Sequence, residues 1–209
     1  MFISQLKISS LRLVGGLAVL DYVNTCNGRR PGSGLGEIVD KLATLEDVVR
    51  WFHRARLIDD DEFEYCLGLA EQPLASSSFN RLVEFREQLY QLLLPVALGL
   101  PPLTVALDNL NRALVATAGH RGLGIQGQQV VWRWRFPRSL EDLTDNFISR
   151  LATQAANLLT EPDQSRLKVC ATPDCDWLFI DSSKNGGRRW CQMNICGSRE
   201  KARKRGSAC

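Results

Sequence analysis

Four cysteines near the C-terminal end of this 209-residue chain have the spacing of a metal site. Cys170 and Cys175 form one pair, and Cys191 and Cys196 form a second, in the pattern C-x4-C-x15-C-x4-C. Two closely spaced pairs joined by a loop can supply four thiolates to one tetrahedral ion. Because no histidine stands at ligand spacing, the set favours one Zn²⁺ per chain, with iron as the alternative. A closed shell of four sulfurs leaves no position for water, so the predicted role is structural.

The residues between and after the cysteines predict a small fold around that ion. Trp177–Ile180 is a short apolar run, and the turn-forming pair Asn185-Gly186 predicts a hairpin in which Arg188–Trp190 is the returning strand. Helix-forming residues follow over Ser198–Arg205, with Gly206 as the terminator. A knuckle, a hairpin and a helix around one ion indicate a treble-clef-like finger.

The same region resembles the CGNR zinc finger family. The resemblance rests on Trp177–Asp181, Arg188–Cys191 and Cys196–Arg199, which reads CGSR and so has Ser198 where the family has Asn. Near the other end, Leu20–Thr25 (LDYVNT) resembles the LDxVNT-type motif that opens the ABATE-type domain of stress-induced bacterial transcription regulators. The resemblance implies a bacterial transcription regulator that binds DNA through its finger.

Basic charge gathers at the end of the chain that holds the cysteines. The formal net charge is +3, but the part from Arg166 onward holds ten Lys and Arg against four acidic residues, so it carries +6 and the remainder −3. Four thiolates on a divalent ion leave −2, which nearby basic groups can offset, yet +6 exceeds that need. The excess predicts contacts to DNA phosphates by Arg188, Arg189, Arg199, Lys201, Arg203, Lys204 and Arg205. The alternative is a zinc-stapled protein-interaction or small-ligand-sensing module without direct DNA binding.

The part before the finger predicts a mainly helical domain. Apolar residues recur at helical spacing behind the capping residues Thr44, Asp59, Ser76 and Ser139, and a further helix follows Pro101-Pro102. Glu161–Ser165 is polar and contains Pro, so it is the expected linker. We therefore divide the chain into a helical regulatory domain, residues 1–163, and the finger, residues 164–209.

One β-hairpin is expected within this helical domain. From His120 to Phe136 the composition shifts to Gly and β-forming residues, which predicts two antiparallel strands. Trp132 and Trp134 share one face of the second strand. That face can pack into the core or stack on nucleic acid, and we expect it to be buried. The predicted fold class is mainly α, with a small antiparallel hairpin and a four-cysteine finger.

Asp21 and Asn24 stand three residues apart in an apolar segment, so one helical face carries both. These groups either hydrogen-bond to neighbouring loop backbone or line a pocket for a small-molecule effector. We favour the first interpretation because buried polar groups are nearly always satisfied structurally. The domain that contains them is expected to sense a ligand or to mediate homodimer formation.

Other patterns narrow the class of protein. His53 and His120 stand without an acid or nucleophile in a recognisable arrangement, and no nucleotide-binding or hydrolase motif accompanies them, so we expect no enzyme. No apolar run approaches the ~20 residues that cross a membrane. Seven cysteines, three of them isolated, fit a reducing cytoplasm better than a disulfide scaffold.

Overall fold

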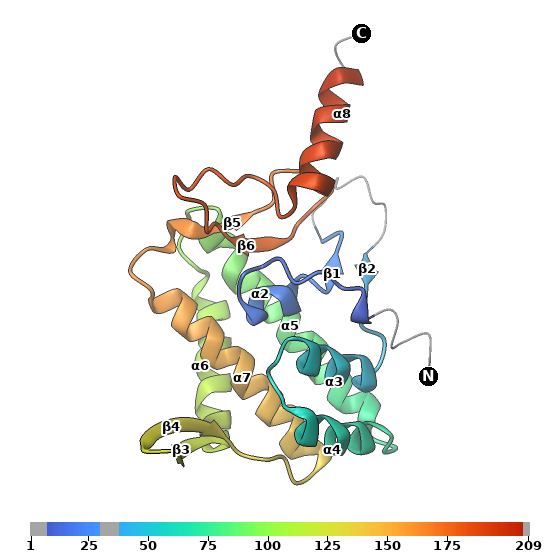
Figure 1. Ribbon diagram of the computed structural model, residues 1–209, viewed down its shortest axis with the longest axis vertical. Coiled ribbons are helices and arrows are strands. Elements are labelled where there is room, and N and C mark those ends of the chain that lie inside the picture. Colours follow the sequence, from blue (N-terminus) through green and yellow to red (C-terminus); the bar gives the residue numbers. More distant parts are fainter. Residues whose placement is uncertain (1–7, 30–37, 207–209) are drawn as a thin grey trace.

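The computed structural model of the chain describes residues 8–29 and 38–206, and most of these are helical. Three helices form one side of the molecule: α5 (Ala75–Ala97), α6 (Thr104–Thr117) and α7 (Leu140–Thr160) pack against one another (Figure 1). The shorter helices α2 (Ala18–Val23), α3 (Leu45–Arg54) and α4 (Asp60–Ala70) pack on α5 and α7. The predicted mainly helical fold class is confirmed.

Side-chain caps start three of the four helices for which the sequence predicts them. The exception is α5, which begins at Ala75 after Leu74 without a side-chain cap, so the predicted cap Ser76 lies inside the helix. Thr44, Asp59 and Ser139 each accept a hydrogen bond from the backbone N–H three residues later, at 3.1, 2.9 and 3.1 Å. Such bonds satisfy donors that have no partner inside the helix. The apolar stripes of the capped helices then meet in one core, in which the Phe52 and Phe147 rings stack at 3.8 Å.

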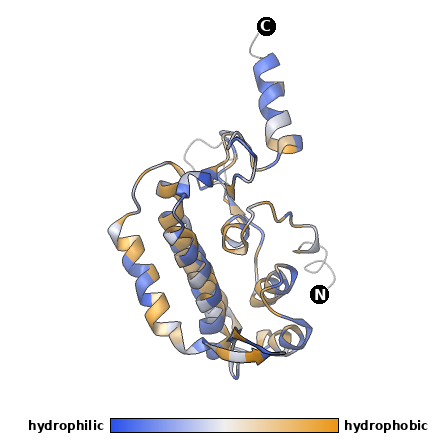
Figure 2. Cartoon of the chain, turned by 60° about the vertical axis from the view of Figure 1, so that its left-hand side comes forward, coloured by the Kyte–Doolittle hydropathy of each residue, from blue (hydrophilic) through white to orange (hydrophobic). Residues whose placement is uncertain are grey.

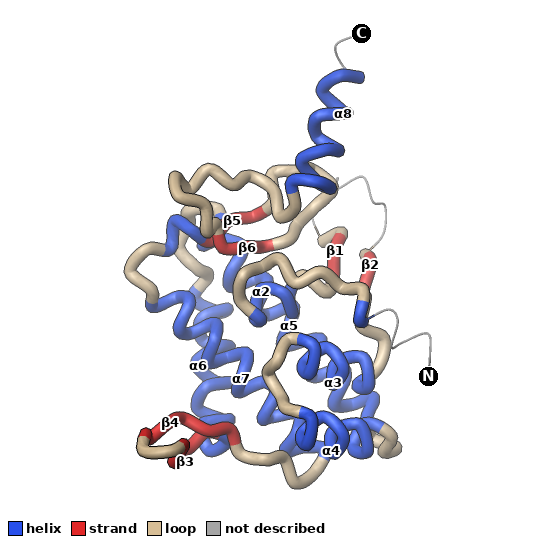
Figure 3. The backbone as a smooth tube through the Cα atoms, viewed as in Figure 1, coloured by secondary structure: helices blue, strands red, loops and turns tan. Residues whose placement is uncertain are grey.

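The strands of the described residues form three separate antiparallel pairs (Figure 3). The first is β1 (Cys26–Asn27) with β2 (Val39–Asp40), and the second is β3 (Arg121–Gln126) with β4 (Gln129–Trp134). The third lies in the finger and consists of β5 (Leu167–Val169) and β6 (Leu178–Ile180). Only the second pair is the hairpin expected within the helical domain.

The aromatic face of β3–β4 is not buried, which corrects our expectation. Trp132 is 60% exposed and Trp134 is half-buried. Instead of entering the core, both rings lie under the guanidinium of Arg121, 4.3 and 5.6 Å from their centroids. The hairpin joins the end of α6 to the start of α7 and lies at one end of these helices (Figure 1).

The hairpin predicted inside the finger is also wrong in its partner strand. Arg188–Trp190 forms no strand, and β6 pairs instead with β5, in a register that joins Leu167 to Ile180 and Val169 to Leu178. Asn185-Gly186 does turn the chain, with Gly186 at φ 61°, but it returns as irregular backbone. The reason is burial: Leu167 and Leu178 both belong to the helical core, so apolar contact selects β5 as the partner.

The finger is therefore packed onto the helices rather than hung from a linker. β5 contacts α5, and β6 contacts α2. A short 3₁₀ turn, η2 (Gln164–Arg166), connects α7 to β5. The division at residues 163 and 164 stays a prediction about folding units. Among the helices of the described residues, none is both long and apolar enough to cross a membrane.

Candidate metal centre and basic helix

The four cysteines of the predicted site come together. Their sulfurs lie within 4.8 Å of one another, all four side chains are buried, and none is in a disulfide. The Sγ atoms of Cys175 and Cys191 are 3.7 Å apart, and those of Cys191 and Cys196 are 3.5 Å apart. A zinc–sulfur bond of about 2.3 Å places tetrahedral sulfurs about 3.8 Å apart, so the cage has the size that Zn²⁺ needs.

Neighbouring donors prepare these sulfurs to carry negative charge. The Cys191 N–H points at the Cys170 Sγ at 3.5 Å, and an Arg199 guanidinium N–H points at the Cys196 Sγ at 3.4 Å. Hydrogen bonds from the Cys175 and Cys191 thiols lower the pKa of Cys170, and the same contacts raise the pKa of Cys175 and of Cys191, so Cys170 is the thiol of these three that ionises most readily. Such contacts around the ligands orient them and balance their charge.

The last ligand is joined directly to the C-terminal helix. Cys196 lies in a π-helical turn, η3 (Met193–Gly197), which continues into α8 (Ser198–Gly206). Gly197 is buried beside the ring of Trp190, and a Cβ there would meet that ring at 3.4 Å and the Met193 sulfur at 2.6 Å. Ser198 is exposed, and its hydroxyl donates to the Met193 carbonyl at 3.4 Å. The direction of α8 is thus set at the metal centre.

Asp21 and Asn24 are committed to backbone hydrogen bonds, as in the interpretation we favoured. The Oδ1 of Asp21 accepts from the N–H groups of Val14 and Gly15, both at 2.7 Å. Burial raises the pKa of Asp21, and these two bonds oppose that shift. Asn24 differs from expectation in its partner: its amide donates to the Leu178 carbonyl at 2.8 Å and accepts from the Leu178 N–H at 2.9 Å. It therefore joins the helices to β6.

The Arg188 guanidinium is bonded to backbone carbonyls rather than directed to solvent. Its guanidinium donates to the carbonyls of Ile180, Trp190, Cys191 and Val14, at 2.6–3.1 Å. The same group lies 4.2 Å from the centroid of the Phe179 ring. Since its donors already face carbonyls, Arg188 clamps the finger to the N-terminal segment.

The remaining basic residues of the predicted set are exposed, and most lie on α8. Arg199 and Arg203 form ion pairs with Asp174, at 2.7 and 3.5 Å, on the side of α8 that faces the knuckle. Lys201 and Arg205 are four residues apart, exposed, and without an ion pair among the described residues. Lys204 and Arg189 are exposed as well. The structure adds Asp174, an acid whose pairing our sequence reasoning did not foresee.

The helix α8 projects from the rest of the molecule. It extends from the finger away from the helical core (Figure 1), and its residues are strongly hydrophilic over most of its length (Figure 2). Its sequence, SREKARKRG, carries five basic residues and one acid. The helix thus presents positive charge to solvent at one end of the molecule.

Comparison with known families decides where the chain belongs. Residues 16–162 match the ABATE family, described as "Putative stress-induced transcription regulator". The chain belongs to this family. Residues 166–206 match the CGNR zinc finger, a range that includes all four cysteines and α8. The family match and the four-sulfur cluster fit one structural zinc. A search of curated proteins finds no match.

Proposed function

We propose that this member of the ABATE family regulates transcription by binding DNA with α8, while the zinc centre holds that helix in place. The observation that carries the proposal is the exposed, basic α8, attached at Cys196 and extending away from the core. The family description supports a regulator, and positive charge on a protruding helix supports phosphate contact. The role is one of binding rather than catalysis.

The two sides of α8 receive different roles in this proposal. Asp174 pairs with Arg199 and Arg203, and Glu200 also pairs with Arg203, so the charge on this side is largely offset and the Asp174 pairs help to fix the helix on the knuckle. Lys201 and Arg205 lie on the other side and are assigned to phosphate, and the exposed Lys204 and Arg189 are further candidates for phosphate contact. Knuckle, short strands and helix around one ion give the treble-clef-like arrangement. The reducing bacterial cytoplasm, where such a regulator would act, keeps the cysteines able to bind zinc.

The test compares two charge-matched pairs of substitutions. Lys201→Ala with Arg205→Ala should weaken binding to duplex DNA and lower the slope of log K against log salt by about two, one for each lost phosphate contact. Arg112→Ala with Arg138→Ala removes the same charge from exposed positions on α6 and before α7, and should leave that slope unchanged. Zinc content should be unaffected in both. Equal DNA binding by the α8 pair and the parent at every salt concentration would reject the proposal.

A second candidate is a protein-interaction module, which the exposed face of β3–β4 favours. Leu123, Ile125, Val130 and Trp132 share that face, and each is at least 60% exposed. Apolar patches on folded proteins often mark contact surfaces. If the α8 pair leaves DNA binding intact, or if the parent does not bind duplex DNA at low salt, this candidate takes precedence.

A further inference from the structure

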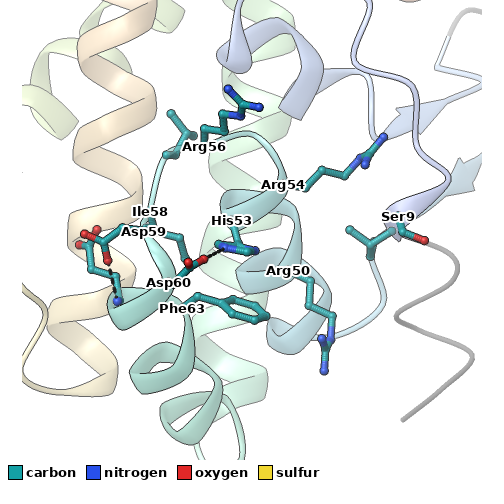
Figure 4. A pocket seen from close by; sticks show the side chains of 12 residues that line it. Ser9, Arg50, His53, Arg54, Arg56, Ile58, Asp59, Asp60 and Phe63 are labelled. Carbon is teal, nitrogen blue, oxygen red and sulfur yellow. Dashed lines mark hydrogen bonds and ion pairs between the residues drawn. The ribbon is translucent and has the colours of Figure 1, made fainter.

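A wide hollow on the described surface lies between α3 and α4. It has a volume of about 810 Å³, within the range of small-molecule sites. Ile8, Ile58 and Phe63 give it apolar walls, while Arg50, His53, Arg54 and Arg56 bring basic groups to it. Figure 4 shows the Arg54 and Arg56 side chains pointing away from the His53 and Phe63 rings, toward different sides of the pocket.

Most of the charged groups around this pocket are already paired. Asp60 binds the His53 ring at 2.8 Å, Glu62 pairs with the buried Arg150, and Asp59 caps α4. Arg50 pairs with Glu46 at 2.8 Å. These pairs leave two guanidinium groups, those of Arg54 and Arg56, without a carboxylate partner among the described residues.

Arg56 has a left-handed backbone conformation, which favours glycine. Its φ is 57°, and it is the one non-glycine residue with positive φ in the described chain. It closes α3, with its N–H bonded to the His53 carbonyl and the next N–H bonded to the Phe52 carbonyl, both at 2.9 Å. Helices commonly end in this way on Gly. Here the side chain instead reaches the rim of the pocket, exposed and without a hydrogen bond from a described residue.

Two of the side chains that line the pocket carry rings. The His53 and Phe63 rings stack with centroids 4.2 Å apart and planes inclined by 15°. A guanidinium binds a carboxylate or phosphate through two parallel N–H donors. We propose that this pocket binds a small organic anion whose carboxylate or phosphate is held by Arg56, and by Arg54 once it turns from Leu11, with a planar apolar part packed near His53 and Phe63.

The pocket is also connected to the finger through one continuous segment, Ile8–Gly15. Arg54 donates two hydrogen bonds to the Leu11 carbonyl, at 2.6 and 3.1 Å. Further along, Arg12 donates to the Gln192 side chain at 3.3 Å, and the Val14 carbonyl accepts from Arg188. The Gly15 carbonyl accepts from the Ile180 N–H of β6 at 2.7 Å. An anion that draws Arg54 away from Leu11 would therefore act on a segment that holds the finger.

Binding is tested on the full zinc-loaded chain by calorimetry with 2-naphthoate, its neutral analogue 2-naphthamide, and inorganic phosphate. We expect 2-naphthoate to bind at least about ten-fold more tightly than the amide, because charge-assisted hydrogen bonds contribute a factor of that order. Arg56→Gly removes the guanidinium at a position that suits Gly, so it should lose about ten-fold in affinity without a fall in melting temperature. Arg56→Asn, which also tolerates this backbone, should behave alike.

The matched control is Arg112→Ala, an exposed arginine on α6, which should bind 2-naphthoate as the parent does. Three results overturn the site: equal binding of acid and amide, unchanged affinity in both Arg56 variants, or no binding of either anion at millimolar concentration. This test does not depend on DNA binding, because calorimetry measures only the affinity of the protein for the anion.

The connection to the finger has its own readout. Amide hydrogen exchange at Gly15 and Ile180 should change on adding 2-naphthoate to the parent, and should not change in Arg56→Gly. An unchanged exchange rate in the parent at saturating 2-naphthoate would overturn the connection and leave the binding site standing.

Discussion

The two halves of the finger are held by different forces. β5–β6 places Leu167 and Leu178 in the helical core, and Asn24 bonds to both backbone groups of Leu178. By contrast, α8 is mostly charged and exposed, and it begins at the last zinc ligand. Apolar burial therefore fixes the hairpin, whereas the metal and the Asp174 ion pairs fix the helix. We call β5–β6 the anchored half of the finger, and η3 with α8 the presented half.

The largest effect should come from removing the metal. A structural zinc site contributes on the order of 10 kcal/mol to folding, so chelation or Cys191→Ser should release α8 and leave most of the helical core. Elemental analysis should find about one zinc per parent chain, and circular dichroism should show a partial loss of helix on chelation. Complete loss of helicity would show instead that finger and core unfold as one unit.

Cys66→Ser is the control for this experiment. Cys66 is buried in α4, away from the cluster, so its replacement should leave the zinc content at that of the parent. Burial raises the pKa of the Cys66 thiol to about 12, so in the native parent it should resist thiol reagents at neutral pH. A chelator should then expose only the four ligand cysteines to such reagents.

The next effect tests the anchored half. Leu178 is fully buried in the core, and Leu178→Ala should lower the free energy of unfolding by about 2–5 kcal/mol through lost burial and a cavity. Met193→Ala, at a 56% exposed position in the presented half, should change it by less than about 0.5 kcal/mol. Urea titration measures both. Similar losses in the two variants would erase the contrast between the halves.

A smaller loss is expected where the helices meet the finger by hydrogen bonds. Asn24→Ala leaves the buried N–H and carbonyl of Leu178 without their partner, at a cost of about 2 kcal/mol. Asn157→Ala, at an exposed position of α7, is the control and should be nearly neutral. If Asn24→Ala is equally neutral, the docking of β6 depends on apolar contact alone.

The smallest stability effect belongs to the presented half itself. Lys201→Ala with Arg205→Ala should change the free energy of unfolding by less than about 0.5 kcal/mol, because both side chains are exposed. The DNA measurement described above would then separate function from folding. A loss above 2 kcal/mol in urea would show that these residues support the fold.

The sequence was sufficient for the parts of the finger that depend on local spacing. The cysteine pattern predicts the cluster because each pair lies within a few residues, and the caps at Thr44 and Ser139 predict helix starts for the same reason. The pairing of β6 was missed because a local turn at Asn185-Gly186 was weighed above burial. The alternation Leu167-Lys168-Val169, directly before Cys170, was the signal available for the correct partner.

Long-range contacts account for the other differences. Whether Trp132 is covered depends on where α6 and α7 end, and no local pattern records that. The Arg188 clamp reaches Val14, 174 residues away, so its structural role was hidden within a basic run. The pocket arginines were also overlooked, although Arg50, Arg54 and Arg56 follow one another closely in the sequence. They line one pocket because the chain turns at Arg56 between α3 and α4, and no glycine marks that turn.

The bonds made by Asn24 have one more consequence. Each strand of a two-stranded sheet has an outer edge, and on β6 this edge consists of the N–H and carbonyl groups of Leu178 and Ile180. Asn24 takes both groups of Leu178, the Gly15 carbonyl takes the Ile180 N–H, and Arg188 takes the Ile180 carbonyl. Together these groups supply the hydrogen bonds that a third strand would make to β6. Since open edges recruit strands from other chains, this arrangement protects the β6 edge of the finger from pairing with another chain.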